Sequence, residues 1–232
     1  WFTVIDLKDA FVCIPLDKSS RKLFAFEWEN PHNGRKTQLT WTRLPQGFKN
    51  SPTLFGSQLV KELESWTMQG QIQVPRSQYL LLQYVDDILI ATELESTCIQ
   101  VTIEILNQLG LNGYKVSREK VQIACTTVVY LGCEITQGQR KLGMDRVQAI
   151  CAIPEPRNLH KLRSFLGMTG WCRLWILDYG LIAKPLYEAQ KSLTFIWEGP
   201  QKEAFRKLKK ALTMAPALIL LDLTNNFQLF VH

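Results

Sequence analysis

The chain has 232 residues, of which 46% are hydrophobic, so it is long enough to bury a core as one large domain or two small ones. Its 27 Lys and Arg against 21 Asp and Glu give a net charge of +6, which favours an anionic partner, nucleic acid first, although many soluble domains are equally basic. Six Cys without a CxxC pair and three His argue against a zinc site and a disulfide framework, and no apolar run is long enough to predict a membrane span.

The cysteines and the two ends of the chain indicate its setting. The cysteines are typical of reduced core thiols, so we expect an intracellular protein and not a secreted one. The chain begins at Trp1 without an initiator Met and ends within the apolar run "LFVH". We therefore expect it to be a piece of a longer chain.

The N-terminal elements follow from the alternation of apolar and polar residues. An apolar strand pattern, "WFTVIDLKDAF", opens the chain and ends at Asp6. The segments "KLFAFEWE" and "KTQLTWTRL" alternate on either side of the turn cluster "NPHNG", which predicts a hairpin with one face in a core. After "LPQGFKNSP", Ser51 is expected to cap a helix that has Pro52 in its first turn and ends near Met68. The apolar stripe of this helix comprises Leu54, Phe55, Leu59 and Leu63.

A second hairpin holds two adjacent acids. The apolar segments 80–84 and 88–91 are joined by Val85, Asp86 and Asp87, which predicts a tight turn. A helix starting at Ser96 and ending at Gly110 to Gly113 follows, and "VVYLGCEI" predicts a further strand before the turn "TQGQRKL". The expected apolar face of that helix comprises Ile99, Ile103, Leu106 and Leu109. This order of elements predicts an α+β fold, a split β-α-β arrangement with an antiparallel sheet and helices on one face.

The C-terminal part is predicted to be helical. The composition changes at "IPEPRN", residues 153–158, which we interpret as a boundary. A helix is expected from about Leu159, a second segment runs through "PLYEAQK", and a last helix spans about 200–214. Phe205, Leu208 and Leu212 form the apolar face of the last helix.

The acids have two interpretations. Asp is favoured in turns, so Asp86 and Asp87 could be turn formers. If the strand ending at Asp6 lies in the same sheet, Asp6 and Asp86 present their carboxylates together, and two close carboxylates repel unless a cation neutralises them. Mg²⁺ prefers such oxygen ligands, and two ions can stabilise the attacking and leaving oxygens of a phosphoryl transfer. An aromatic-x-Asp-Asp sequence between apolar strands, with a second Asp upstream, favours the metal site.

Six segments together carry a family resemblance. In chain order they are "TVIDLKDAF", "LTWTRLPQGFKNSPTLF", "YVDD", "YLGCEI", "LRSFLGMTGWCRLWI" and "APALILLDLTNNFQLFV". They resemble, respectively, the first acidic motif, the following motif, the catalytic hairpin, the primer grip, the thumb helices and the start of the connection segment of retroviral reverse transcriptases. The chain is similar to the gammaretrovirus-like branch and to the Pol polyproteins of endogenous retroviruses.

The resemblance implies a fold and a division into domains. A right-hand polymerase palm, with the antiparallel sheet described above, would be followed by a helical thumb and the start of a connection segment. Residues 1–140 would be the palm, with a partial fingers hairpin at about 17–45. Residues 141–190 would be the thumb, and 191–232 an incomplete connection segment.

The resemblance also implies catalytic residues. Asp6 and Asp86 would ligate two Mg²⁺ ions, with Mn²⁺ as an alternative, and the Leu7 carbonyl would help to hold one. Asp87 would be a supporting acid with a weaker metal role. Lys120, in "SREKVQ", matches the position proposed to protonate the leaving pyrophosphate. A solvated surface lysine is an equally good interpretation of Lys120 from the residues alone.

The nucleotide site is implied in the same way. Backbone amides at Asp9 and Ala10 would meet the triphosphate. Phe11 would be a steric gate that fills the space of a ribose 2′-OH, although core packing is the default role for such a residue. Gln46 would line the nucleotide and template side. Gly47 would admit the substrate close to the backbone or simply serve the turn.

Two groups of residues would contact the template-primer duplex. Tyr130, Leu131 and Gly132 would position the primer end, although alone they form an ordinary strand. The basic residues beside the apolar Leu159, Leu162, Phe165 and Leu166 suit phosphate contacts, and an ordinary solvated helix face is the alternative. These basic residues are His160, Lys161 and Arg163.

The implied function is RNA-directed DNA polymerase, a nucleotidyltransferase that acts with deoxynucleoside triphosphates on an RNA or DNA template-primer, in the cytoplasm or virion core. The alternatives are an inactive endogenous-retrovirus remnant that binds nucleic acid, and a nuclease activity such as ribonuclease H, supplied by another part of the polyprotein. The family's N-terminal fingers and ribonuclease H domain are absent from this chain. Leu177 stands where the family usually has Pro, and His232 where it usually has an acid.

Overall fold

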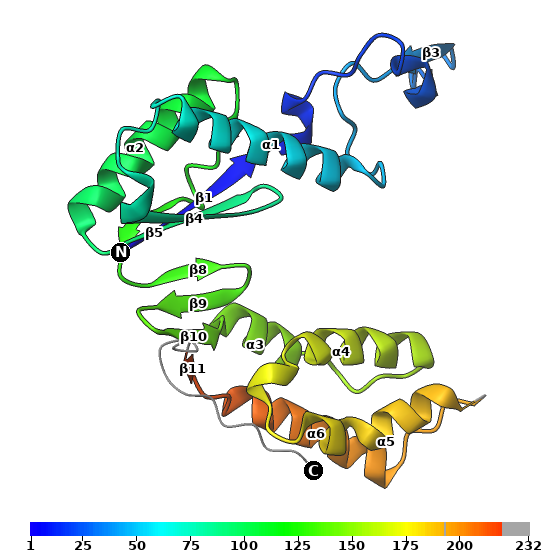
Figure 1. Cartoon of the computed structure of the whole chain (residues 1–232). Helices are drawn as coiled ribbons and strands as arrows, with labels where there is room; N and C mark the ends of the chain where they lie inside the picture. Colours follow the sequence, from blue (N-terminus) through cyan, green and yellow to red (C-terminus); the bar gives the residue numbers. More distant parts are fainter. Residues whose placement is uncertain (193, 220–232) are drawn as a thin grey trace. The chain divides into compact units, whose positions relative to one another are not determined.

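A computed structural model describes residues 1–192 and 194–219, within two compact units, Trp1–Val128 and Val129–His232 (Figure 1). The chain end with His232, and most of the segment that resembles the connection, lie outside the described residues. The units divide after Val128, and not at 140 where the sequence placed the end of the palm. The assignment of palm, thumb and connection to residue ranges stays a prediction.

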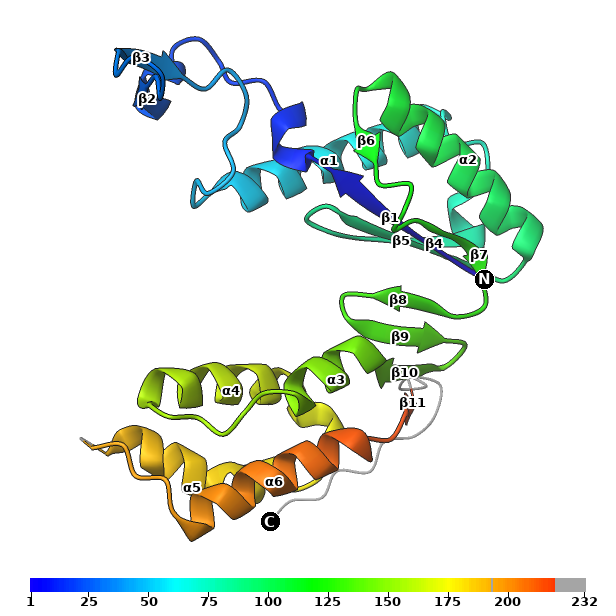
Figure 2. The ribbon, with the colours of Figure 1, turned by 180° about the vertical axis from the view of Figure 1, so that it is seen from behind.

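The first unit is built on an antiparallel sheet with helices on one face, as the sequence predicted (Figures 1 and 2). The strand order is β4 (Tyr79–Tyr84), β5 (Asp87–Thr92), β1 (Phe2–Lys8) and β6 (Lys115–Val116), and β7 (Gln122–Cys125) also pairs with β1. The covering helices are α1 (Ser51–Met68) and α2 (Glu95–Leu111). Two short 3₁₀ helices, η1 (Ala10–Cys13) and η3 (Arg76–Gln78), connect elements of this unit.

Alternation along the two central strands separates the core from the acids. Ile5 and Leu7 of β1, and Ile88 and Ile90 of β5, belong to the core with both helices. Successive residues of a strand point to opposite faces, so Asp6 projects from the face that the helices leave open. The strand continues past its predicted end at Asp6 to Lys8, because its last two residues pair with β6.

Helix α1 has the predicted length, but two details differ. Asn50, not Ser51, is the N-cap residue, and the Ser51 hydroxyl instead donates to the Pro45 carbonyl at 2.7 Å. Leu54 was expected on the apolar stripe but is exposed, because Phe55 and Leu59 fill the interface with the sheet.

Helix α2 buries only part of the predicted face. Leu109 is fully buried and Leu106 packs against the core, but Ile99 and Ile103 are exposed. The buried side also carries Cys98 and Thr102. The Thr102 hydroxyl donates to the Cys98 carbonyl at 2.7 Å and forms a hydroxyl–hydroxyl contact with Thr3 of β1 at 2.9 Å. A hydroxyl with two such contacts is satisfied inside the core, which a count of apolar residues does not reveal.

The predicted N-terminal hairpin forms but buries neither face. Strands β2 (Ala25–Glu29) and β3 (Lys36–Thr40) pair as a two-stranded sheet, after a 3₁₀ turn η2 (Arg21–Phe24). Every residue of both strands is exposed, so the prediction of a core face was wrong. A two-stranded ribbon has no second layer of its own to bury a face against.

In its described residues, the second unit combines a small sheet with four α-helices. The strand order is β11 (Leu218–Ile219), β10 (Gln139–Leu142), β9 (Cys133–Thr136) and β8 (Val128–Tyr130). The helices are α3 (Met144–Cys151), α4 (Leu159–Trp171), α5 (Tyr179–Lys191) and α6 (Gly199–Thr213). A 3₁₀ turn, η4 (Arg173–Trp175), follows α4. The predicted single strand over 128–135 is therefore two strands with a turn, and the predicted turn "TQGQRKL" contains β10. The segment 153–158 lies between α3 and α4 within this unit.

One core unites the four helices. Phe165 of α4 and Phe205 of α6 pack with ring centroids 4.4 Å apart, and the predicted apolar face of α6 is buried. Helix α6 therefore packs with α4 and α5, although the sequence placed it in the connection segment. None of the helices in the described part of the chain combines the length and apolarity that spanning a membrane requires.

Candidate active site

The two central strands of the first sheet bring a pair of carboxylates together. Asp6 of β1 lies directly opposite Asp87 of β5 in the antiparallel register. The Leu7 amide donates to the Asp86 carbonyl at 3.0 Å, so Asp6 and Asp87 form a non-hydrogen-bonded pair, whose side chains lie close together on one face. The sequence placed Asp6 beside Asp86, whereas in the structure Asp87 is the cross-strand partner.

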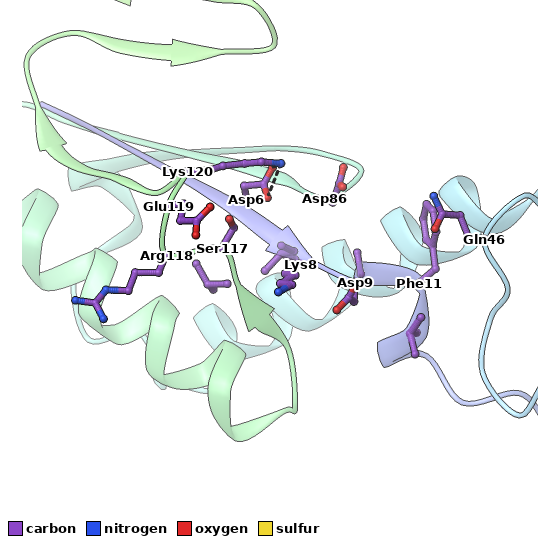
Figure 3. A pocket seen from close by; sticks show the side chains of 14 residues that line it. Asp6, Lys8, Asp9, Phe11, Gln46, Asp86, Ser117, Arg118, Glu119 and Lys120 are labelled. Carbon is purple, nitrogen blue, oxygen red and sulfur yellow. Dashed lines mark hydrogen bonds and ion pairs between the residues drawn. The ribbon is translucent and has the colours of Figure 1, made fainter.

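Asp86 belongs to the hairpin turn and still faces the same space as Asp6. Both residues line one cavity of about 610 Å³ at the end of β1. Figure 3 shows Asp6 on β1 and Asp86 at the neighbouring hairpin, with Lys120 reaching Asp6. The three acids therefore gather at one end of the sheet, although their individual roles stay predictions.

The turn that carries Asp86 is held in a strained conformation. Val85 has φ 54°, in the left-handed region, where a β-branched residue is a genuine outlier. The Gln83 side-chain amide donates to the Val85 carbonyl at 2.5 Å and braces the turn from inside the hairpin. Such strain persists where surrounding contacts determine the backbone, and it is concentrated at functional sites.

The charges at this end of the sheet are unbalanced. Burial raises the pKa of Asp87, and the charges of Asp86 and Asp6 raise it further, while Lys120 acts in the opposite direction. The Lys120 ammonium donates to both Asp6 carboxylate oxygens, at 3.3 and 3.2 Å, and this contact raises the pKa of Lys120. Lys120 is therefore the local counterion of Asp6, and Asp87 carries repulsion that a further cation would relieve.

The cavity lined by Asp6 and Asp86, called the carboxylate cavity below, is also lined by most of the residues predicted to bind nucleotide. Asp9, at φ 53°, precedes η1, whose first residues are Ala10 and Phe11, and all three line the cavity together with Gln46. Gly47 does not line it. At φ 92° this glycine adopts a conformation that other residues rarely take, which supports the turn interpretation.

Phe11 is supported by a chain of aromatic contacts that the sequence did not suggest. Its ring meets Phe55 of α1 edge to face, with centroids 5.8 Å apart, and Phe55 meets Tyr114 in the same way at 6.1 Å. The Tyr114 hydroxyl donates to Glu62 at 2.7 Å, and burial and the Glu62 contact raise the pKa of Tyr114. Core packing and a gate role are thus compatible for Phe11, because one ring edge is held while the side chain still lines the cavity.

Several further residues line the cavity that sequence reasoning missed. They are Lys8, Ser117, Arg118 and Glu119, beside the predicted Lys120. In Figure 3 the Arg118 side chain points away from the labelled carboxylates. The charged run "SREK" was the available signal, and the pairing of β6 with β1 is what brings it to the site.

The donor set fits a hard divalent cation in part. Asp6 and Asp86 offer carboxylate oxygens, and burial, followed by the charges of Asp86 and Asp6, raises the pKa of the neighbouring Asp87. Within the described residues, no group of three or more His, Cys, Asp or Glu side chains converges into a metal cage. Mg²⁺ is usually held by one or two carboxylates plus substrate phosphates and waters, which matches an incomplete protein cage.

Of the residues predicted to grip the primer, Tyr130 ends strand β8, and Leu131 and Gly132 form a turn. Leu131 and Gly132 have φ 51° and 76° and connect β8 to β9, the two positive values that a type I′ hairpin requires. Tyr130 is buried and Leu131 is partly exposed. The φ of Gly132 is one that other residues rarely adopt, and a Cβ there would also require the Arg146 guanidinium to shift.

The predicted duplex contacts lie on one exposed side of α4. His160, Lys161 and Arg163 are exposed, and Leu162 is fully buried between them, as predicted for an amphipathic helix. The Asn158 side chain caps the helix by accepting from the Lys161 amide at 2.9 Å. The geometry leaves this basic surface free for phosphates and does not distinguish that role from a solvated face.

Comparison with protein families gives one match over more than half of the chain. Residues 1–135 match the family described as reverse transcriptase (RNA-dependent DNA polymerase). The chain is 48% identical over 232 residues to the Gag-Pol polyprotein of baboon endogenous virus (strain M7) and 47% identical to the Pol polyprotein of feline endogenous virus ECE1. The chain covers only 13% and 22% of these two relatives, which are therefore much longer than it is.

Solved structures agree with this match. A foamy viral protease-reverse transcriptase in complex with double-stranded DNA has a TM-score of 0.80 and 32% identity, over 95% of this chain and 36% of that one. The same kind of protein in complex with an RNA/DNA hybrid has a TM-score of 0.78 over 92% of this chain and 27% of that one. The predicted α+β polymerase fold is thereby confirmed.

Proposed function

The chain belongs to the reverse transcriptase family, and we propose that its first unit carries an RNA-directed DNA polymerase site that adds deoxynucleotides to a primer 3′-OH. The observation that carries the proposal is the Asp6–Asp87 cross-strand pair, with Asp86 in the adjoining turn, at a cavity lined by Phe11 and Gln46. The family depends on divalent metal ions. We further propose two Mg²⁺ ions, with Mn²⁺ as an alternative.

The carboxylates would hold these ions. Bound metal supplies positive charge for the attacking and leaving oxygens of phosphoryl transfer. Asp6 and Asp86, helped by the Leu7 carbonyl, are the proposed ligands, and Asp87 adds negative charge beside Asp6. The strained turn at Val85, braced by Gln83, fixes Asp86 against β1 before substrate arrives.

Lys120 and Phe11 would act on the substrate itself. The ammonium of Lys120 lines the cavity and is exposed, so it can leave Asp6 and donate a proton to the departing pyrophosphate. The Phe11 ring, held by Phe55, would occupy the space that a ribose 2′-OH requires and so favour deoxynucleotides. Backbone groups at Asp9 and Ala10 would meet the triphosphate.

The proposed macromolecular partner is an RNA or DNA template-primer duplex. The solved relatives are bound to double-stranded DNA or to an RNA/DNA hybrid, which supports this partner. In this chain the turn at 130–132 would position the primer end, and the basic side of α4 would contact phosphates without reading sequence. We also propose that the site works in the cytoplasm or in a virion core.

Primer extension tests the polymerase proposal. The chain is given an RNA template with a DNA primer, deoxynucleoside triphosphates and Mg²⁺ or Mn²⁺, and incorporation is measured for the unchanged protein, Asp86→Asn and Asp145→Asn. Asp86→Asn should lower the rate by at least about 10²-fold, because it removes charge from the reacting centre. Asp145→Asn, an exposed change on α3, should leave the rate unchanged. Extension that Asp86→Asn leaves intact would refute the metal assignment.

A second candidate is a remnant that binds nucleic acid without polymerising it. The net charge of +6 and the exposed basic residues of α4 favour binding independently of the carboxylates. This candidate expects salt-sensitive duplex binding that Asp86→Asn does not weaken, together with no incorporation by any variant. The binding and extension measurements made side by side therefore separate the two candidates.

A further inference from the structure

Two lysines face each other at the edge of the carboxylate cavity. The register places Lys8 of β1 directly opposite Lys115 of β6, and both side chains are exposed. Side chains directly opposite in an antiparallel pair share a face and lie about 5 Å apart at Cβ, where like charges destabilise the pair. Within the described residues neither ammonium forms an ion pair. The repulsion is therefore uncompensated by protein groups.

A second cavity adjoins the first beside these lysines. It has about 620 Å³ and shares Asp9 and Val12 with the carboxylate cavity. Lys8 lines the first cavity, and Lys115 lines the second. The lysine pair therefore spans the border between the two cavities.

The second cavity has a positive lining that is partly fixed in place. Arg43 and Lys115 line it with a single carboxylate, that of Asp9, and the acids Asp6 and Asp86 do not reach it. The Arg43 guanidinium donates from Nη1 to the Cys13 carbonyl at 3.0 Å, which holds the planar group at the cavity wall. Concave sites lined by one sign of charge concentrate ions of the opposite sign.

We propose that Lys8, Lys115 and Arg43 form a pyrophosphate site that receives the leaving group of the polymerase reaction as it passes from the carboxylate cavity into the second one. The proposal rests on the proposed function, because nucleotide addition breaks the bond between the α- and β-phosphates and releases pyrophosphate. A guanidinium offers two parallel donors to phosphate oxygens, and lysines act as mobile point charges. Three cations offset the opposing charge of Asp9, and a bound anion relieves the repulsion within the lysine pair.

Calorimetric titration of the whole chain with inorganic pyrophosphate tests the site without nucleotide, nucleic acid or divalent metal. The variants are Lys8→Gln, Lys115→Gln and Arg43→Gln, and the control is Lys61→Gln, an exposed lysine of α1 that lines neither cavity. Each site variant should weaken pyrophosphate binding about tenfold, and the control should leave it unchanged. Lys115→Arg should retain binding, because it keeps the charge.

Stability gives a second readout that a merely structural role would not produce. Without pyrophosphate, Lys115→Gln should raise the denaturation midpoint, because it removes the like-charge contact, while Lys61→Gln should not. Adding pyrophosphate should raise the midpoint of the unchanged protein and have a smaller effect on Lys115→Gln.

Three binding results would overturn the proposal. They are no saturable binding of pyrophosphate by the unchanged chain, an equal loss in Lys61→Gln, or site variants that lose duplex binding while they keep pyrophosphate binding. The third outcome would assign the lysines to nucleic acid. Asp86→Asn separates this proposal from the polymerase proposal, because it should bind pyrophosphate like the unchanged chain while failing to extend a primer. If the unchanged chain binds pyrophosphate but never extends a primer, the three cations form an anion site, and their proposed role in product release is rejected.

Discussion

The first unit contains two hairpins that behave differently in structure. Both consist of two strand segments about a turn and form antiparallel pairs, the first from alternating apolar and polar residues and the second from apolar segments. The β2–β3 hairpin is exposed along its whole length, whereas β5 of the β4–β5 hairpin buries Ile88, Leu89 and Ile90. A hairpin pattern therefore predicts pairing but does not predict what the pair is packed against.

The difference matters because position is what a charged site requires. Strand β5 has β1 as a second neighbour and helix α2 on one face, so Asp87 is fixed opposite Asp6. In the β2–β3 hairpin a carboxylate and a lysine also meet, Glu27 and Lys36 at 2.8 Å, but both side chains are exposed. Exposed pairs of this kind contribute little, whereas acids held on a packed strand can be used for chemistry.

The largest contrast should appear when one apolar side chain is removed from each hairpin. Ile90→Ala in β5 deletes a fully buried side chain and should lower the free energy of unfolding by about 2–5 kcal/mol. Leu39→Ala in β3 removes a side chain that is 42% exposed and should change it by less than about 0.5 kcal/mol. Urea denaturation followed by circular dichroism measures both. Similar losses in the two variants would show that β2–β3 packs against another part of the protein.

A smaller contrast should follow from removing one glutamine from each hairpin. Gln83→Ala in β4 loses the hydrogen bond to the Val85 carbonyl and should cost about 1 kcal/mol of unfolding free energy. Gln38→Ala in β3, an exposed position, is the control and should cost less than about 0.5 kcal/mol. Primer extension by Gln83→Ala should fall as well, because the turn that holds Asp86 loses its brace. Unchanged stability and extension would remove Gln83 from the description of the site.

The sequence predicts elements well where one pattern decides them. The span of α1, the β4–β5 hairpin and the buried face of α6 follow from apolar spacing, and all three are confirmed. The buried face of α2 follows only in part, because Thr102 is buried against a partner, Thr3, that lies far away in the chain. Contacts of this kind depend on tertiary structure.

The sequence named the members of the candidate site, whose roles stay predictions, but it did not give their register. Asp6, Asp86 and Asp87 were named from the motif, but their relative placement depends on a turn in which Val85 adopts a conformation that valine rarely takes. The same limit applies to Leu131, predicted in a strand and found at φ 51° in a turn. Lys8 lies within "TVIDLKDAF" and Lys115 lies outside the quoted motifs, and both were missed because the strand pairing alone brings them together.

The burial of Asp87 predicts a pH dependence of stability. Its pKa in the folded chain is raised above the ordinary value of 3.8 by burial and by Asp86 and Asp6. The folded state therefore binds this proton more tightly than the unfolded state, and stability falls as the pH rises from 3.8 through the folded pKa. Asp87→Asn should stabilise the chain at neutral pH and lose that advantage below 3.8. Denaturation midpoints at both pH values measure this, with Asp145→Asn as the matched control, and an advantage independent of pH would contradict it.

The smallest expected effect compares the two lysine–carboxylate pairs of the first unit. Lys120 donates to both oxygens of Asp6 and so competes with any cation that Asp6 would bind, whereas Lys36 pairs with Glu27 on the exposed hairpin. Lys120→Gln should raise the affinity for Mn²⁺ about twofold to fivefold, and Lys36→Gln should leave it unchanged. Electron paramagnetic resonance of free Mn²⁺, without nucleotide or nucleic acid, measures this independently of catalysis.

Primer extension by Lys120→Gln separates two roles for this lysine. If Lys120 leaves Asp6 to act on the leaving group, Lys120→Gln should bind Mn²⁺ more tightly and extend the primer more slowly. If Lys120 only fills the metal position, Lys120→Gln should bind Mn²⁺ more tightly without slower extension. Lower Mn²⁺ affinity in Lys120→Gln would instead mean that the lysine supports the metal site and does not compete with it.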